Sequence, residues 1–243
     1  HLARCGVEVR TVCTVQTLSQ SRGGYVVLFS NADGADESLR ADAVVCAMGG
    51  SAGPQFGTDG FGPRFAAQCG GALAPLYPCL TALQCAKPDK RLAGIRAKAH
   101  AALYSGSTLL ADYRGEVQFT DYGLSGICIM DLTRHLTPAV KSPAVELDLF
   151  PDVAEDALSA LFAARVPLLP GDTAADFWLG LLNAKLGRAL WQAAGLPDAD
   201  VHRLSAAQWQ KLAHTAKHWL FEGLTPCGWK QAQVTGGGLA LTE

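Results

Sequence analysis

The sequence predicts an α+β chain with more than one structural part, and three observations support this. Residues 44–48 form an unbroken apolar run that ends at Gly49-Gly50, which is typical of a strand buried on both faces. Short strand-like segments separated by turns fill residues 77–150. From Asp152 onward, apolar residues recur at helical spacing instead. The pattern therefore changes from a mixed first part to strands and then to helices.

The composition is that of a globular protein without a strong charge bias. The chain has 243 residues, of which 49% are hydrophobic and 17% charged, enough to fill one large core or two small ones. The formal net charge is -2, which argues against a nucleic-acid partner and against a cationic face for membranes. No apolar run approaches the roughly 20 residues of a membrane span, and no secretory signal is visible.

The eight cysteines indicate a reducing compartment and not a disulfide framework. No two of them form a C-x-x-C pair, so neither a zinc knuckle nor a thioredoxin-type redox motif is expected. Most lie inside apolar runs, where cysteine behaves as a small hydrophobic residue. We therefore expect a cytoplasmic location.

The two ends of the sequence indicate a piece of a longer protein. Residues 1–4 resemble the last turn of a helix, residues 239–241 resemble the start of a strand, and no initiator Met is present. The chain is therefore expected to begin and end inside larger elements.

The first part is expected to contain a β meander. Gly23-Gly24 is good hairpin-turn chemistry and joins two of its strands. The expected elements are a helix ending at Gly6, strands at residues 7–11, 12–19 and 25–30, a turn at 31–37, and the buried strand at 44–48. This order is that of the crossover in a doubly wound nucleotide-binding domain in which a meander replaces a helix. An ordinary α+β hairpin fits the same pattern.

A glycine-rich loop and a short helix follow. The helix is expected at residues 64–69, stopped by Gly70-Gly71. The loop before it, residues 57–60, could present backbone N–H groups to an anion, although a glycine-rich loop alone is a weak signal and a plain loop is the alternative.

Prolines at positions 75 and 78 make the next segment extended and suggest a domain boundary near residue 76. A small sheet or barrel is then expected from strands at residues 79–85, 93–104, 107–113, 115–120 and 144–150, with a helix at 127–135. Further helices are expected at residues 152–165, 173–180, 182–194 and 205–215. We expect Trp178, Trp191, Trp209 and Trp219 to fill the core between these helices and not to line a cofactor.

Other candidate sites are weak. His214 and His218 have the i, i+4 spacing of a metal pair, but the segment lacks the H-E-x-x-H pattern, so solvated histidines and no metal site are expected. Ser51 and Ser125 stand in glycine-rich turns without the G-x-S-x-G pattern of a nucleophile.

Four stretches carry a family resemblance, and the last two are specific. Residues 44–50 are similar to a strand ending in A-T-G-G, and residues 57–62 to G-[ST]-x-G-x-G-Y. Residues 115–126 are very close to G-E-[LV]-L-F-T-x-Y-G-[IL]-S-G, and residues 230–238 are close to A-x-V-T-x-G-G. With these motifs in this order and spacing, the whole chain resembles the YhiN/BaiN-like flavoproteins, a family of NAD(P)/FAD-dependent oxidoreductases.

The resemblance implies a partial FAD-binding, Rossmann-like domain interrupted by a long insert. Residues 1–76 would form its first piece, with a meander and buried strands, and residues 229–243 would return to it. The insert, residues 77–228, would comprise a small β-barrel or sheet over 77–150 and a helical subdomain over 151–228. We also expect the strand at 44–48 to pair with the returning strand at residues 233–235.

The same resemblance implies five flavin-side positions, namely Cys13 in the meander and Ala47, Met48, Gly49 and Gly50 after it. The chain departs from the family at Met48, where Thr is usual, and at Phe61, where a small or acidic residue is frequent. It also contains no G-x-G-x-x-G to hold the pyrophosphate. FAD is therefore expected in the full-length protein and not in this chain alone.

The implied activity is reduction of a small apolar substrate with a reducible double bond, with NAD(P)H as a candidate electron donor. The motifs identify no catalytic acid or base. The alternative is that the chain is a catalytically silent binding, cap or partner-docking module.

Overall fold

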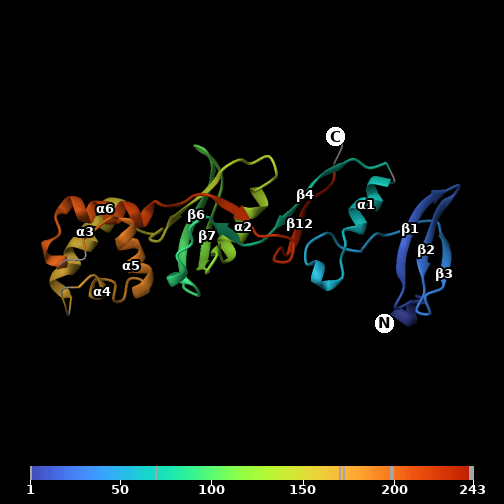
Figure 1. Ribbon diagram of the computed structural model, residues 1–243, viewed down its shortest axis with the longest axis horizontal. Coiled ribbons are helices and arrows are strands. Elements are labelled where there is room, and N and C mark those ends of the chain that lie inside the picture. The colour runs from blue at the N-terminus through green and yellow to red at the C-terminus, as the bar shows by residue number, and fades with distance from the viewer. Residues whose placement is uncertain (1, 69, 170, 172, 198–199, 241–243) are drawn as a thin grey trace. The chain divides into compact units, whose positions relative to one another are not determined.

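The computed structural model describes residues 2–68, 70–169, 171, 173–197 and 200–240 (Figure 1). The chain divides into two compact units, one made of residues 1–51, 56–76 and 237–243 and the other of residues 52–55 and 77–236. Both strands and helices are present and the paired strands of the two larger sheets are antiparallel, so the predicted α+β class is confirmed. No helix in the described part is long and apolar enough to span a membrane.

The first unit contains the predicted meander. Its strands are β1 (Thr14–Ser21), β2 (Gly24–Ser30) and β3 (Asp36–Ala41), paired in that order. Gly23, at a φ of 84°, forms the tight turn between β1 and β2. Leu18 and Phe29 are buried on the sheet, whereas most other meander side chains are exposed or half-buried. Apolar alternation and turn chemistry predicted β1 and β2, whereas β3 was not predicted and begins within the turn expected at residues 31–37.

Two predicted strands of this unit are absent. Residues 7–11 are exposed and do not form a strand; the guanidinium of Arg10 bonds the nearby Glu8 instead, at 2.7 Å. Residues 44–48 are also outside any strand, and Val45 is 91% exposed. A strand needs a hydrogen-bonding neighbour as well as an apolar pattern, and no described strand pairs with residues 44–48.

The α-helix found in the described part of this unit, α1 (Phe61–Gln68), begins three residues before the predicted start. The rings of Phe61 and Phe65 stack at 6.4 Å, and Phe65 is buried. Gly70, at a φ of 90°, ends the helix as predicted, with its N–H donating to the carbonyl of Ala67.

Strands β4 (Leu73–Cys79) and β12 (Val234–Leu239) pair with each other. The prediction that residues 233–235 pair with residues 44–48 is therefore wrong. Gly237 has a φ of 79°, and a Cβ at this position would overlap the carbonyl of Pro75, so only glycine allows this approach. A Cβ at Gly236 would overlap the ring of Tyr77.

The second unit contains a seven-stranded antiparallel sheet with the order β10-β9-β6-β7-β8-β5-β11. The strands are β5 (Leu83–Cys85), β6 (Arg96–Ser105), β7 (Thr108–Phe119), β8 (Gly123–Ser125), β9 (Pro143–Asp148), β10 (Trp219–Phe221) and β11 (Leu224–Pro226). The strands predicted at 107–113 and 115–120 form one continuous strand, β7, because Gly115 keeps its pairing with β6. The helix α2 (Ile127–Leu132) packs against β7 at Gly115. The predicted helix at 127–135 is shorter than expected and ends as a 3₁₀ turn, Thr133–His135.

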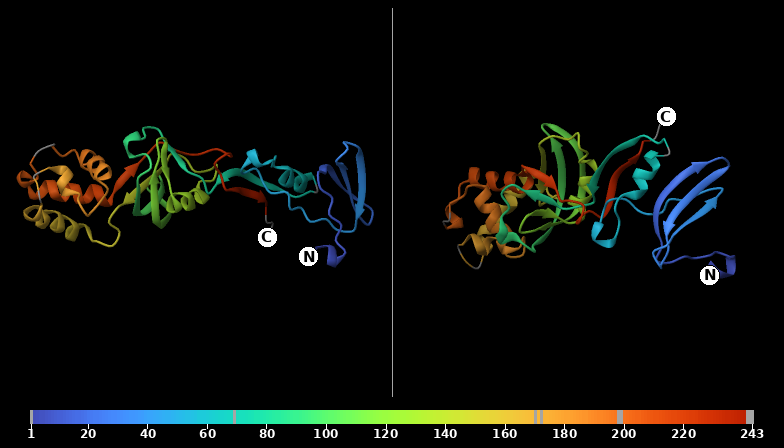
Figure 2. Two further views of the ribbon diagram at one scale, coloured as in Figure 1. Left: turned by 90° about the horizontal axis from the view of Figure 1, so that it is seen from below. Right: turned by 45° about the vertical axis from the view of Figure 1, so that its right-hand side comes forward.

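Four helices complete this unit and gather at one end of the sheet (Figure 2). They are α3 (Glu155–Arg165), α4 (Ala174–Phe177), α5 (Ala184–Ala193) and α6 (Ala206–Lys217). Short 3₁₀ turns are found at Pro54–Phe56, Lys90–Leu92, Val166–Leu168 and Val201–Arg203. Ser205 and Thr173 each form a capping box at a helix start. The helix expected from residue 152 begins at Glu155 instead, with Ala154 at the N-cap position, and Asp152 pairs with Arg114 at 3.0 Å.

An aromatic cluster forms the core between the helices. Phe177 packs edge-on against Trp178 at 4.9 Å and stacks with Trp209 at 5.0 Å, while Trp191 lies 6.1 Å from Trp209. The core positions predicted for these three tryptophans are confirmed. Trp219 differs, because it lies in β10, half-buried against Phe119.

Candidate functional site

The predicted flavin-side residues 47–50 form an extended loop of the first unit. Ala47, Met48 and Gly49 are exposed, and Gly50 is half-buried. Gly49 has a φ of 73°, a conformation that favours glycine. The hydroxyl of Thr58 donates a hydrogen bond to the carbonyl of Gly50. Residues 47–49 of the loop are therefore accessible to solvent, and Gly50 is hydrogen-bonded to the second glycine-rich segment, residues 57–62.

That second segment approaches the loop at two glycines. A Cβ at Gly62 would lie 3.0 Å from the carbonyl of Gly49, and a Cβ at Gly60 would lie 2.7 Å from the hydroxyl of Ser51. Gly60 also has a φ of 75°. Two stretches of the family motif, residues 44–50 and 57–62, are thus in contact, which the sequence spacing alone did not establish.

Cys13 is the remaining predicted position. It is half-buried just before β1, and its thiol donates a hydrogen bond to the carbonyl of Thr11 at 3.5 Å. No hydrogen bond joins it to residues 47–50 in the described part of the chain. The structure brings four of the five predicted positions into one loop and leaves Cys13 with a local contact.

The loop at residues 57–60, which could present backbone N–H groups to an anion, makes an internal contact at the start of α1 instead. The N–H of Phe61 donates to the carboxylate of Asp59 at 2.9 Å, and this carboxylate also pairs with Arg64 at 2.7 Å. Asp59 thus places a negative charge where the helix dipole would otherwise favour a phosphate. One N–H group at the start of α1 is therefore already used within the chain.

A cluster of polar side chains in the second unit was not predicted. The hydroxyl of Tyr113 lies 3.0 Å from Nε2 of His135 and accepts a hydrogen bond from Arg134 at 3.1 Å. The Arg134 guanidinium also lies over the Tyr113 ring, 5.4 Å from its centroid. The hydroxyl of Tyr77 donates to the carbonyl of Arg134 at 3.0 Å. These residues come from β4, β7 and the 3₁₀ turn Thr133–His135, which are far apart in the sequence. A local sequence motif therefore could not predict the cluster.

A pocket of about 440 Å³ opens at the rim of the seven-stranded sheet. Its apolar wall includes Phe119, Trp219 and Phe221, whose rings lie 5.0–6.3 Å apart. Cys85 also lines it, and burial raises the pKa of this thiol to about 11, so the thiol is neutral at physiological pH. Lys87, Asp89 and Glu222 add polar groups. This volume and lining are within the range of small-molecule sites.

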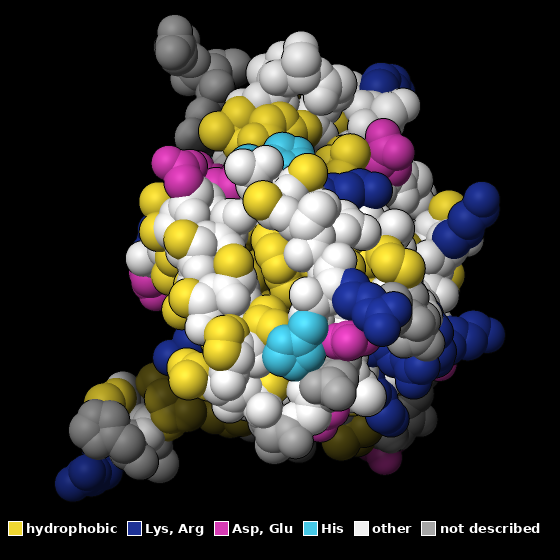
Figure 3. Space-filling view, turned by 90° about the vertical axis from the view of Figure 1, so that its left-hand side faces the viewer, with side chains coloured by type: hydrophobic (Ala, Val, Ile, Leu, Met, Phe, Trp, Pro, Cys, Tyr) yellow, Lys and Arg dark blue, Asp and Glu magenta, His cyan; other side chains and the backbone are white. Residues whose placement is uncertain are grey.

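Positive side chains are concentrated locally despite the net charge of -2. A hollow of about 430 Å³ is lined by Arg91, Lys185 and Arg188, with Ala189 and Gln192. Figure 3 looks onto the helical part and shows Lys and Arg side chains gathered on one side of that face. The net charge therefore does not by itself exclude a polyanionic partner, because local clusters set the surface potential.

The specific motif at residues 115–126 has a structural explanation. A Cβ at Gly123 would overlap the carbonyl of Leu83, and a Cβ at Gly126 would overlap that of Glu116. The hydroxyl of Thr120 accepts a hydrogen bond from the N–H of Gly123 at 2.9 Å and closes the turn. The motif packs β5, β7, β8 and α2 together, so it specifies the fold of the sheet and not a catalytic group.

Comparisons with known proteins identify the family of the chain. Residues 77–234 match the family described as "HI0933-like protein barrel and H2TH domain". A 3-dehydro-bile acid delta(4,6)-reductase of Clostridium scindens is 31% identical over 248 residues, covering 100% of this chain and 59% of the relative. A ribosomal RNA dihydrouridine synthase of Escherichia coli is 25% identical over 210 residues, covering 85% of this chain and 50% of the relative. The chain thus spans between half and three-fifths of these curated relatives.

Proposed function

We propose that this chain, which belongs to the HI0933-like flavoprotein family, is part of an FAD-dependent reductase that adds two hydrogens across a carbon–carbon double bond. The observation that carries the proposal is the similarity of the whole chain to a curated reductase. The second relative is named for forming dihydrouridine, which is uridine with two added hydrogens, so reduction is common to both names. The cytoplasmic location stays a prediction from the cysteine pattern.

In this proposal the first unit is a partial Rossmann-like, FAD-binding domain. The exposed backbone of Ala47, Met48 and Gly49 would face the flavin ring, because its conformation lets a flat group come close. Asp59 at the N-terminus of α1 keeps the pyrophosphate away from this helix. When bound, FAD supplies the hydride, with NAD(P)H as the proposed electron donor.

The second unit by itself contains two candidate surfaces for a substrate. The aromatic wall of Phe119, Trp219 and Phe221 supports a flat or apolar substrate in the pocket at the rim of the sheet. An RNA substrate is the second candidate, supported by the hollow lined by Arg91, Lys185 and Arg188, where Arg91 is already paired with Asp89 at 2.7 Å and a phosphate would have to share or displace this carboxylate. The two candidates differ in salt dependence, because only phosphate contacts weaken steeply as salt rises.

Reduction also needs a proton, and Tyr113 is the proposed source. Tyr113 does not line the aromatic pocket, so the proposal requires the reducible bond of the substrate to extend beyond this pocket to the Tyr113 hydroxyl. Its phenol hydroxyl is held between Arg134 and His135, so its orientation is fixed by two partners. A hydroxyl positioned in this way can donate a proton to the substrate while His135 supplies a replacement.

The test is spectroscopic and uses two proteins, this 243-residue chain and the longer protein of which we propose that it is a part. The longer protein should purify yellow, with flavin absorbance near one equivalent, and should be bleached by NAD(P)H. This chain alone should be colourless and should not retain added FAD, because two or three lost charge-assisted hydrogen bonds at roughly 1.5–3 kcal/mol each weaken binding by several powers of ten. A longer protein that rejects FAD would refute the proposal.

A non-catalytic docking module is the alternative function. It is favoured by the independence of the second unit, whose core of buried residues, from Leu83 to Leu224, lies entirely within residues 77–236. A longer protein that binds no flavin but captures a stable partner through this unit would support the alternative.

A further inference from the structure

We propose that Glu155, His214 and His218 form a binding site for a divalent transition-metal ion of the zinc type. One ligand atom from each of the three residues can be chosen so that all lie within 4.8 Å of one another. The sequence indicated solvated histidines here, but the tertiary structure adds a carboxylate to the histidine pair.

The secondary structure holds the two histidines on one face. His214 lies in the last turn of α6, and His218 caps the helix, with its N–H donating to the carbonyl of His214 at 2.8 Å. This i, i+4 contact brings the two imidazole rings to a centroid distance of 4.8 Å. Glu155, the first residue of α3, lies opposite them. The site therefore joins the start of one helix to the end of another.

The ligand atoms converge on the Glu155 carboxylate. Nδ1 of His214 lies 3.1 Å from one of its oxygens, and Nε2 of His218 lies 3.3 Å from the other. Two imidazole nitrogens and a carboxylate are the donor set of zinc sites that keep a fourth position open. All three side chains are accessible to solvent, so an ion can enter and a water molecule can complete the coordination.

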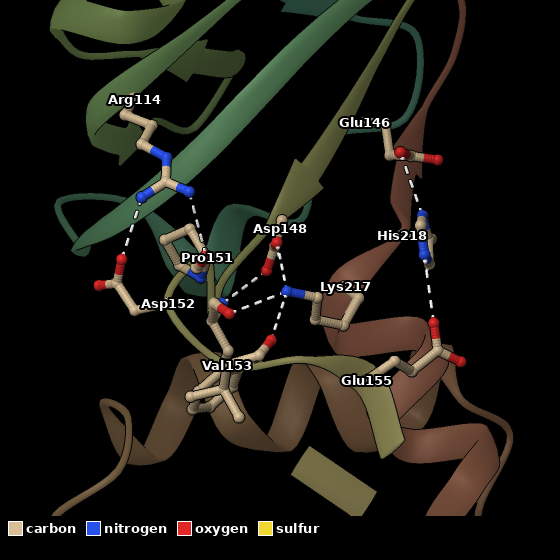
Figure 4. Close-up of polar contacts among 10 residues, drawn as sticks. Arg114, Glu146, Asp148, Pro151, Asp152, Val153, Glu155, Lys217 and His218 are labelled. Atoms are coloured by element: carbon tan, nitrogen blue, oxygen red, sulfur yellow. Dashed lines mark hydrogen bonds and ion pairs between the residues drawn. The ribbon is translucent and has the colours of Figure 1, made fainter. Parts of the chain in front are cut away.

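A second carboxylate supports the metal interpretation. Nδ1 of His218 lies 3.1 Å from Glu146 in β9, so His218 lies between two carboxylates (Figure 4). A metal-binding histidine characteristically donates its other ring N–H to a carboxylate, which fixes the tautomer and the orientation of the ring. The contact with Glu146 thus leaves Nε2 of His218 directed at Glu155, where an ion would bind.

The neighbouring residue keeps this arrangement in place. The ammonium of Lys217 pairs with Asp148 at 2.6 Å and donates to the carbonyls of Phe150 and Val153 at 2.9 and 2.7 Å (Figure 4). These contacts fix the end of α6 against β9 and against the segment that leads into α3. The ligands are thus positioned before binding, which reduces the entropy lost when an ion binds.

The experiment is calorimetric titration of the metal-free chain with Zn²⁺. We expect one saturable site with a micromolar dissociation constant. His214→Gln and His218→Gln should each weaken binding by at least about tenfold, and Glu146→Gln by about 10- to 100-fold through loss of the supporting carboxylate. His100→Gln is the matched control, because His100 also pairs with a carboxylate, Asp112 at 2.7 Å, without a second histidine. Its dissociation constant should equal that of the unchanged chain.

Co²⁺ provides a second measurement that does not depend on the stability of any variant. Binding at this site should produce visible absorption bands of a four- or five-coordinate ion, and Zn²⁺ should displace them. The proposal is overturned if the unchanged chain shows no saturable Zn²⁺ binding below about 100 μM, or if His214→Gln binds as tightly as the unchanged chain. It is also overturned if His100→Gln weakens binding equally.

Discussion

The indole ring of Trp178 lies directly against Gly187, at a distance where any side chain on Gly187 would overlap the ring. Gly187 is buried in the middle of α5, and Trp178 is fully buried among Phe162 and Phe177. The absence of a side chain at one position therefore allows α5 to close over the aromatic cluster.

The first prediction is that Gly187→Ala destabilises the protein by about 1–3 kcal/mol through overpacking. This sign is opposite to the intrinsic helix preference, which favours Ala over Gly by roughly 1 kcal/mol. Urea unfolding monitored by tryptophan fluorescence measures the change. The control is Gly187→Ala combined with Trp178→Leu, in which the added methyl group has space. A Gly187→Ala variant more stable than the unchanged chain would contradict this account.

A second prediction compares two ion pairs in Figure 4. Lys217 and Asp148 are only 13% and 16% exposed, whereas Arg114 and Asp152 are 63% and 85% exposed. Lys217→Met should lower the free energy of unfolding by about 2–4 kcal/mol, because it leaves a poorly hydrated carboxylate and two carbonyls without their donor. Arg114→Met should change it by less than about 0.5 kcal/mol, because water replaces an exposed partner. Equal losses would show that burial does not set the strength of these pairs.

The third prediction concerns alkaline pH. Burial raises the pKa of the Cys128 thiol from 9.0 to about 11. In the unfolded chain this thiol ionises near pH 9, so between pH 9 and 11 ionisation favours the unfolded state and the free energy of unfolding falls. The fall should be smaller in Cys128→Ala and unchanged in Cys46→Ala, since Cys46 is exposed. Urea midpoints at pH 8, 9 and 10 measure these slopes, and a Cys128→Ala slope equal to that of the unchanged chain would contradict the prediction.

The fourth prediction tests the proposed proton source in the longer flavoprotein. Tyr113→Phe keeps the ring and removes the hydroxyl held by Arg134 and His135, so kcat for substrate reduction should fall by roughly 100-fold with little change in KM. Flavin reduction by NAD(P)H should be unaffected, because that step needs no proton from Tyr113. Tyr104→Phe, on the neighbouring strand, is the control and should leave both steps unchanged. A Tyr113→Phe variant with full kcat would exclude this residue as the donor.

Much of the local structure could be predicted from the sequence because the relevant physics is local. Turn residues such as Gly23 and apolar alternation indicated the hairpin of β1 and β2 but not β3, and spacing of apolar residues indicated the helices. Helix starts were less accurate, because Asp152 is a suitable cap that pairs with Arg114 instead. The glycine motifs were recognised, but their role in close backbone packing became visible only when Gly123 and Gly237 were seen against their neighbours.

The sequence alone determined the α+β class, the family resemblance and the loop that contains Gly49 and Gly50, because composition, periodicity and motifs carry that information. The tertiary structure decided that residues 44–48 form no strand, since a strand depends on a neighbour that an apolar pattern cannot specify. It also decided which distant side chains meet. Tyr113 joins Arg134 across about 20 residues of chain, and Glu155 joins His214 across 59, because strand pairing and helix packing bring together groups whose sequence separation carries no signal.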